Sequence, residues 1–150
     1  WEQISPGASE PVRIVLGSDA ENPSRLTCQD WHGGGADETW NQRGIRKAPA
    51  ANGFWTVDIA RAGEYRIELR RWPKEADLPV NAAYADPRPN RETAPGRAIN
   101  AVQARLKVAS VDQRLPVQAG DKGIVFSVRL PAETGLTSAP ISFIRKTFKD

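Results

Sequence analysis

Hydrophobic and polar residues alternate with a period of two along most of the chain, and no segment shows a convincing helical period. The alternation is clearest in IVFSVRL, residues 124–130, where every second residue is a large apolar one. Strands are predicted over residues 12–16, 25–30, 55–59, 65–69, 102–108, 124–130 and 141–148. Because alternation leaves one face of each strand polar, we expect an all-β fold. The specific prediction is an antiparallel two-sheet β-sandwich of about seven or more strands, jelly-roll, galactose-binding-like or immunoglobulin-like.

The link between two of these strands predicts a hairpin. Residues 60–63, ARAG, place Gly63 where a tight turn favours a positive φ. The following strand carries charges of alternating sign on its polar face: Glu64, Arg66, Glu68 and Arg70. Cross-strand ion pairs on a wet sheet face account for this pattern, and each contributes only about 0–1 kcal/mol.

Two long loops interrupt the strand pattern. Residues 31–53 contain three consecutive glycines and an Asn-Gly pair, and residues 73–97 contain five prolines. Proline cannot donate to a sheet ladder, so the second segment cannot be a central strand. We expect it to be a structured cover over one sheet or a mobile flap. No internal repeat or domain boundary is visible, which predicts one domain over residues 1–150.

Composition narrows the class of protein. The 150 residues are 39% hydrophobic and 26% charged, as in an ordinary soluble domain. The net charge of +3 is too small to argue for a nucleic-acid partner, and no apolar run is long enough to predict a membrane span. Cys28 is the one cysteine, so no internal disulfide forms. The chain begins at Trp1 and lacks methionine, from which we expect an excised or processed piece of a larger protein.

Aromatic and polar side chains gather near the two long loops. Sugars offer apolar C–H faces to aromatic rings and hydroxyls to amide, carboxylate and guanidinium groups. The candidate carbohydrate-binding residues are Trp31, His32, Trp40, Asn41, Gln42, Arg70, Arg71 and Trp72. Strand parity places Trp55 in the core instead. The alternative is that the tryptophans form an aromatic plug that closes one end of the fold, with arginine stacked on the rings.

Two smaller groups of residues suggest metal binding or catalysis. Asp19, Glu21 and Asn22 supply oxygen atoms of the kind that calcium prefers, although a simple turn explains them equally well. Cys28 and His32 suggest a nucleophile pair or a zinc site, but a strand does not bring residues four apart together, and structural zinc needs four ligands. We therefore interpret His32 as a loop residue packed beside Trp31. We expect no catalytic residue in this chain, and no cofactor other than a candidate calcium ion.

Several longer sequence segments resemble a known protein domain. Three segments are similar to the C-terminal β-sandwich domain of bacterial arylsulfatases of the formylglycine-sulfatase family: GSDAENPSRLTCQDWH, WNQRGIRKAPAANGFWTVDIARAGEYRIELRRWPKEADLP and RAINAVQARLKV. The similarity runs over residues 10–131. It implies a non-catalytic accessory domain, periplasmic or secreted, whose partners are the catalytic sulfatase domain in the same chain and sulfated polysaccharide. The last segment, LTSAPISFIRKTFKD, departs from the aromatic-rich strand of that family.

Catalysis within this chain is not expected. Ser9, Pro11 and Arg13 match the skeleton of the sulfatase formylglycine signature, but Val12 stands where that family has a small polar residue, and we interpret the match as coincidence. The accessory domain either packs on the catalytic domain or holds polysaccharide near it. A stand-alone carbohydrate-binding module and a small hydrolase are the two remaining alternatives.

Overall fold

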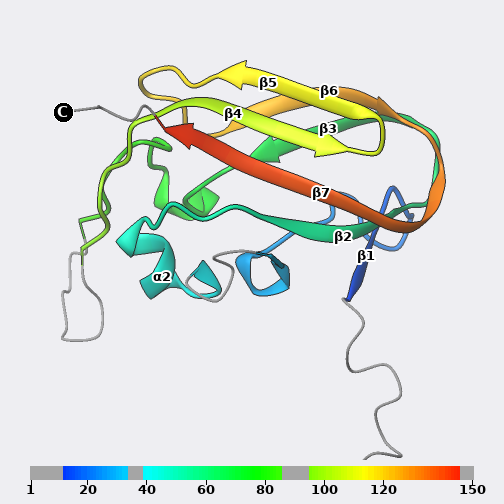
Figure 1. The fold of residues 1–150 in the computed structure, drawn as a ribbon, viewed down its shortest axis with the longest axis horizontal. Coiled ribbons are helices and arrows are strands. Elements are labelled where there is room, and N and C mark those ends of the chain that lie inside the picture. Colours follow the sequence, from blue (N-terminus) through cyan, green and yellow to red (C-terminus); the bar gives the residue numbers. More distant parts are fainter. Residues whose placement is uncertain (1–11, 34–38, 86–94, 146–150) are drawn as a thin grey trace, which may run out of the picture.

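Strands make up most of the protein. The computed structural model describes residues 12–33, 39–85 and 95–145, with only the backbone described for residues 133–145. The elements in chain order are β1 (Arg13–Leu16), η1 (Cys28–Asp30), α2 (Gln42–Lys47), β2 (Gly53–Ile59), β3 (Gly63–Leu69), η2 (Lys74–Ala76), β4 (Ala101–Val108), β5 (Val111–Pro116), β6 (Ile124–Leu130) and β7 (Glu133–Arg145). The described part is thus consistent with the predicted all-β class, and α2 is a short α-helix within it (Figure 1).

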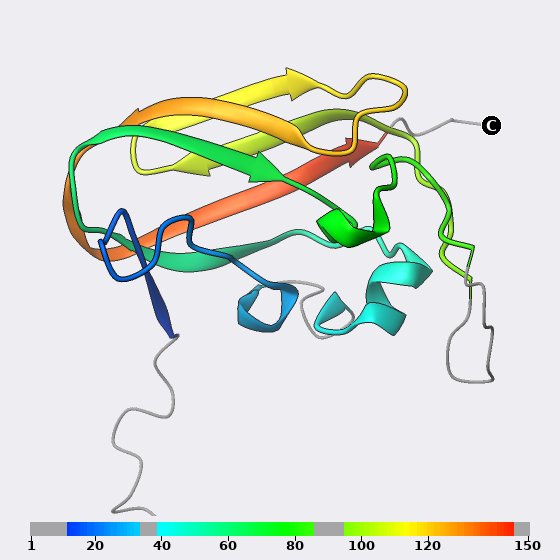
Figure 2. The same ribbon diagram turned by 180° about the vertical axis from the view of Figure 1, so that it is seen from behind.

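The strands form a larger and a smaller sheet. The five-stranded sheet has the order β1-β2-β7-β4-β5, and β3 pairs with β6 in a two-stranded sheet. In Figure 1 the pair β3 and β6 lies behind β4 and β7, and Figure 2 shows the same pair in front, from the opposite side. The helix α2 and the turns η1 and η2 gather near one end and edge of the larger sheet.

The hydrophobic core draws residues from both sheets. On β6 the side chains of Ile124, Phe126, Val128 and Leu130 are buried, whereas Ser127 and Arg129 are exposed. Val57 and Ile59 of β2 and Leu106 of β4 belong to the same buried cluster. The period-two alternation therefore identified the buried face of β6 and most of that of β4, because successive side chains of a strand point to opposite faces; Val102, on the predicted apolar face of β4, is 39% exposed.

The predicted hairpin between β2 and β3 is wrong. β2 pairs with β1 and β7, while β3 pairs with β6, so residues 60–63 carry the chain from one sheet to the other. The positive-φ glycines of the described part are Gly17, Gly33 and Gly120 rather than Gly63. Contacts outside the link set its course: the Ala60 N–H donates to the Leu16 carbonyl at 2.9 Å, and the Tyr65 hydroxyl donates to the Arg61 carbonyl at 2.7 Å.

The predicted strand over residues 25–30 is also wrong. Residues 24–27 are irregular, and Cys28–Asp30 form one 3₁₀ turn. Thr27 caps this turn: its hydroxyl accepts from the Gln29 N–H at 3.3 Å and donates to the Asp30 carboxylate at 2.8 Å. Local side-chain hydrogen bonds of this kind compete with strand formation despite a suitable apolar pattern.

Pairing within the larger sheet departs from a purely antiparallel arrangement. β1 runs parallel to β2, with Ile14 opposite Val57.

The helix α2 lies within the predicted loop 31–53. The Asn41 side chain accepts a hydrogen bond from the Gly44 N–H at 2.9 Å, and Ala48 ends the helix at φ 55°. Six residues are too short for a periodic signal. β5 was not predicted, and β7 begins at Glu133, ahead of the predicted strand 141–148, whose last residues lie outside the described part.

The shared core predicts a large cost for truncating its biggest fully buried side chain. Phe126→Ala removes a ring that is wholly buried among residues of both sheets, and we expect it to lower the free energy of unfolding by about 3–5 kcal/mol. Ser127→Ala, one residue away on the exposed face, should change it by less than about 0.5 kcal/mol. Urea denaturation followed by circular dichroism measures both; equal midpoints for the two variants would contradict a core in this position.

Candidate functional site: a pocket between α2 and η2

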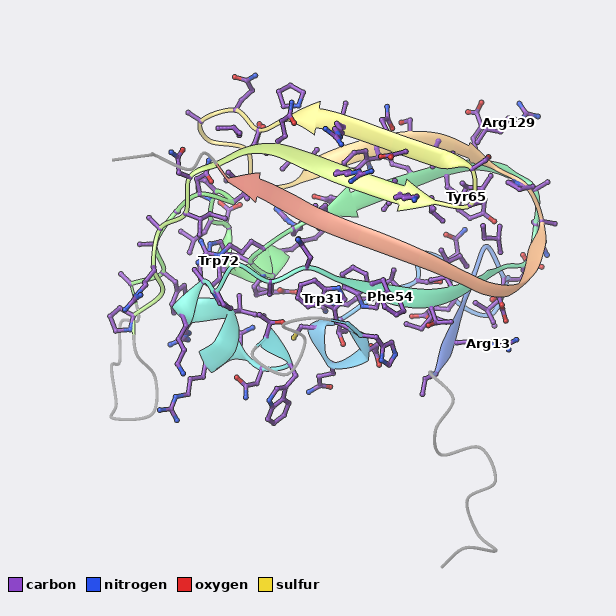
Figure 3. The ribbon with its side chains drawn as sticks, viewed as in Figure 1. Arg13, Trp31, Phe54, Tyr65, Trp72 and Arg129 are labelled. Atoms are coloured by element: carbon purple, nitrogen blue, oxygen red, sulfur yellow. The ribbon has the colours of Figure 1, made fainter. Side chains whose placement is uncertain are left out.

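A surface pocket of about 330 Å³ lies where α2 approaches η2. Its volume is at the small end of the range typical of ligand sites, which is roughly 300–1,000 Å³. The lining mixes aromatic, apolar and hydrogen-bonding side chains: Gln42, Arg46, Trp72, Pro73, Glu75, Ala76 and Tyr84. Figure 3 shows Trp72 beside α2, at the end of the molecule opposite Arg13 and Arg129.

Trp72 forms the base of this pocket inside a stack of rings and guanidinium groups. Its side chain is only 2% exposed, and its ring centroid lies 5.7 Å from that of Tyr84, at an interplanar angle of 35°. The Arg71 guanidinium lies 4.3 Å from the Trp72 ring centroid, and that of Arg46 lies 4.6 Å from the Tyr84 centroid. Cation–π contacts with desolvated rings contribute about 1–2 kcal/mol each. The indole N–H donates to the Ala82 carbonyl at 3.2 Å.

The chain on either side of residues 86–94 covers Trp72. The backbones of Tyr84 and Gly96 exchange hydrogen bonds of 3.2 and 2.8 Å. Gly96 is needed for this close approach, since a Cβ there would lie 2.7 Å from Trp72 Cη2 and 2.9 Å from Tyr84 Cβ. Of the two interpretations of the proline-rich segment, the described residues fit the structured cover; residues 86–94 lie outside the described part.

A separate aromatic group lies along β2. The rings of Trp31 and Trp55 stack with centroids 5.8 Å apart, and the His32 ring lies 5.9 Å from that of Phe54. Main-chain hydrogen bonds of 2.8 Å in both directions join His32 to Phe54. Trp55 packs against the core as predicted but is half-buried, and its indole N–H donates to the Thr27 carbonyl at 2.7 Å. Trp31 thus stacks on Trp55 instead of joining the Trp72 cluster.

The predicted carbohydrate-binding residues are therefore divided between several places. Gln42 and Trp72 line the pocket, whereas Trp31 and His32 lie at β2. Asn41 caps α2, and Trp40, just before it, is 55% exposed. Arg70 Nε lies 3.5 Å from the Glu68 carboxylate. The guanidinium of Arg71 donates to main-chain carbonyls.

Sequence reasoning missed Arg46, Glu75 and Tyr84, which also line the pocket. Gln42 and Arg46 are four residues apart, a spacing that places them on one face of a helix. That signal needs the helix to be recognised first, and α2 is too short for this. Tyr84 and Glu75 lie in the proline-rich segment, where no periodicity marks which side chain turns inward.

The calcium candidates do not form a ligand set. Both carboxylate oxygens of Asp19 accept hydrogen bonds from the Arg61 guanidinium, and this bonding and charge hold the pKa of the Asp19 carboxyl below its ordinary value. Glu21 and Asn22 are exposed. Within the described ranges, no group of three or more His, Cys, Asp or Glu side chains is positioned to hold a metal ion. Asp19 is therefore part of a contact between the 17–23 turn and the link 60–63.

The environment of Cys28 is that of an inert thiol. Its Sγ donates to the Trp40 carbonyl at 3.3 Å, and burial raises the pKa of the thiol above its ordinary value. Nucleophilic cysteines need a lowered pKa, so this shift runs in the wrong direction for catalysis. Ser9 and Pro11, which complete the signature-like match with Arg13, lie outside the described residues.

Comparison with known proteins adds no relative. No family model, no curated protein and no solved structure matches this chain at a significant level. The resemblance to the sulfatase module thus stays a prediction from the sequence. In the part of the chain that the structure describes, no helix has the length and apolarity that a bilayer crossing requires.

The close contact at Gly96 predicts that a methyl group there disturbs the pocket. Gly96→Ala should lower the free energy of unfolding by about 1–3 kcal/mol, because the new Cβ overlaps Trp72 and Tyr84. Gly63→Ala is the matched control: nothing lies within 4 Å of its Cβ position, so stability should stay level or rise by up to about 1 kcal/mol. Thermal unfolding of both variants tests this, and a Gly96→Ala variant as stable as wild type would show that the cover does not pack on Trp72.

The raised pKa of Cys28 predicts slow modification. Because less thiolate is present in the folded protein than in a free thiol, reaction with Ellman's reagent at pH 8 should be several-fold slower for the native chain than for the chain in urea. Absorbance of the released chromophore gives both rates. A native thiol that reacts faster than the unfolded one would indicate an activated nucleophile.

Proposed function

We propose that this protein is a non-catalytic accessory module whose two sheets form a β-sandwich and whose pocket between α2 and η2 holds a carbohydrate chain. The observation that carries the proposal is the lining of the pocket, where the aromatic residues Trp72 and Tyr84 meet the hydrogen-bonding side chains of Gln42, Arg46 and Glu75. Saccharides need both kinds of surface, since their rings carry apolar C–H groups and hydroxyls.

The state of the tryptophans favours a pocket over a flat binding platform. A platform needs at least two ring faces exposed on one surface. Trp72 is buried, Trp31 and Trp55 are half-buried and stacked on each other, and among the described tryptophans Trp40 is the exposed one. The Tyr84 ring also has two neighbours, Trp72 and Arg46. Aromatic groups would therefore shape the floor of the site, while polar side chains at its rim contact the hydroxyls.

The sequence resemblance supplies a biological setting for this proposal. We propose that the module belongs to a periplasmic or secreted sulfatase, accompanies the catalytic domain in the same chain, and holds its sulfated polysaccharide. The mild positive charge of +3 is compatible with an anionic polymer. The inert environment of Cys28 supports a non-catalytic role.

Affinity electrophoresis tests the pocket directly. The wild-type chain should be retarded by a polysaccharide in a panel of sulfated galactans, their desulfated forms and mucin-type glycans. Gln42→Ala removes a hydrogen-bonding amide from the rim, and it should weaken binding about 3- to 10-fold. Trp72 is unsuitable for this test, since its loss would damage the fold.

The controls separate pocket contacts from general charge and helix effects. Arg43→Ala changes an exposed residue of α2 outside the pocket lining, and Glu64→Gln removes an exposed carboxylate on β3; both should bind like wild type. Retardation of wild type by none of the polysaccharides, or equal retardation of all variants, would refute the pocket as a carbohydrate site. Equal binding of sulfated and desulfated polymers would refute the sulfated ligand alone.

A further inference from the structure

Arg71 makes an unusually complete set of contacts with the main chain. Its Nη1 donates to the carbonyls of Val80 and Ala82 at 3.3 and 3.2 Å, and its Nη2 donates to the Arg97 carbonyl at 2.6 Å. The same guanidinium lies over the Trp72 ring. A planar group with five donors suits this arrangement, because it reaches diverging carbonyls while one face stacks on an aromatic ring.

These contacts reach both walls of the pocket. The Ala82 carbonyl also accepts a hydrogen bond from the Trp72 indole, and Ala82 lies two residues before Tyr84. Arg71 therefore holds the pocket wall that carries the rings of Trp72 and Tyr84. The peptide of Arg97 continues the connection: its N–H donates to the Arg46 carbonyl at 2.9 Å. Arg46 belongs to α2, whose side chains form the facing wall.

The rest of the covering segment is fixed in other ways. The Val80 N–H donates to the Asp121 carbonyl at 2.7 Å, and the Ile99 N–H donates to the Asn81 carbonyl at 3.1 Å. The first bond attaches residues 80–85 to the link between β5 and β6. The second bond joins residues 80–85 to residues 95–99, which follow in the chain. One hydrogen-bonded path from the end of β3 to the helix wall runs through Arg71 and the main chain of Arg97, beside the paired backbones of Tyr84 and Gly96.

We propose that Arg71 is the positioning residue of the pocket: it sets the separation of the Trp72–Tyr84 wall and the α2 wall without touching the ligand. The ligand part of this inference rests on the proposed carbohydrate function, whereas the coupling of the two walls does not. The sequence makes Arg71 a candidate for direct sugar or sulfate contact; we infer a positioning role instead because its donors face carbonyls.

Arg71→Lys tests the proposal because it keeps the positive charge and removes the planar fork. Hydrogen exchange, followed by mass spectrometry, should quicken several-fold in peptides covering both 80–85 and 42–48, while the melting temperature falls by only a few degrees. Binding of whichever polysaccharide retards the wild type should weaken about tenfold, as expected for the loss of one hydrogen bond to a charged group. Arg66→Lys, on the exposed face of β3, is the matched control and should match wild type in every measurement.

Each result decides one part of the inference. Unchanged exchange in Arg71→Lys, or faster exchange confined to 80–85, would overturn the coupling of the two walls. Faster exchange at both walls with unaltered binding would overturn the positioning role, provided that Gln42→Ala weakens binding; if Gln42→Ala has no effect either, the proposed function fails while the coupling stands. Should Arg71→Lys unfold, Arg71→Gln, which keeps a planar amide donor, provides the same comparison.

Discussion

Burial of Trp72 is the constraint on which the pocket end of this protein depends. The residue follows β3 at the point where the chain leaves the two-stranded sheet, and its indole is too large to be left exposed without cost. The fold covers it with the segment that contains Ala82, Tyr84 and Gly96. Packing on the indole adds to the core burial of Val80 and the main-chain hydrogen bonds that hold the described parts of this segment in place.

This arrangement explains why arginines gather at the site. A covering segment without regular secondary structure leaves main-chain carbonyls pointing inward, and buried carbonyls need donors. Arg71 satisfies three of them and stacks on the ring at the same time; a lysine ammonium group also has three donors, but it lacks the planar face that stacks on an aromatic ring. The Arg46 guanidinium likewise lies over the ring of Tyr84. The basic character near the pocket is thus in large part structural.

The same geometry limits what the protein can bind and how. With the indole of Trp72 buried and the ring of Tyr84 packed against Trp72 and Arg46, a ligand of the pocket would meet an amide, a carboxylate and a guanidinium beside these rings. Such a site favours a small polar group inserted into a pocket over a polymer lying flat on rings. Elsewhere, Cys28 and Asp19 are occupied by structural contacts, with the Trp40 carbonyl and with Arg61.

The sequence by itself determined the strands whose faces differ most in polarity. Residues 102–108 and 124–130 were predicted correctly as strands because most buried side chains there alternate with less buried ones, and burial of one face is a local property of a strand. The tertiary structure alone decided which strands pair, so that residues 60–63 cross between sheets and β1 lies parallel to β2. It also decided that Arg71 turns to the carbonyls of Val80, Ala82 and Arg97, up to 26 residues away. Hydrogen bonds over such separations depend on how the whole chain folds back, and no local pattern of residue types encodes their partners.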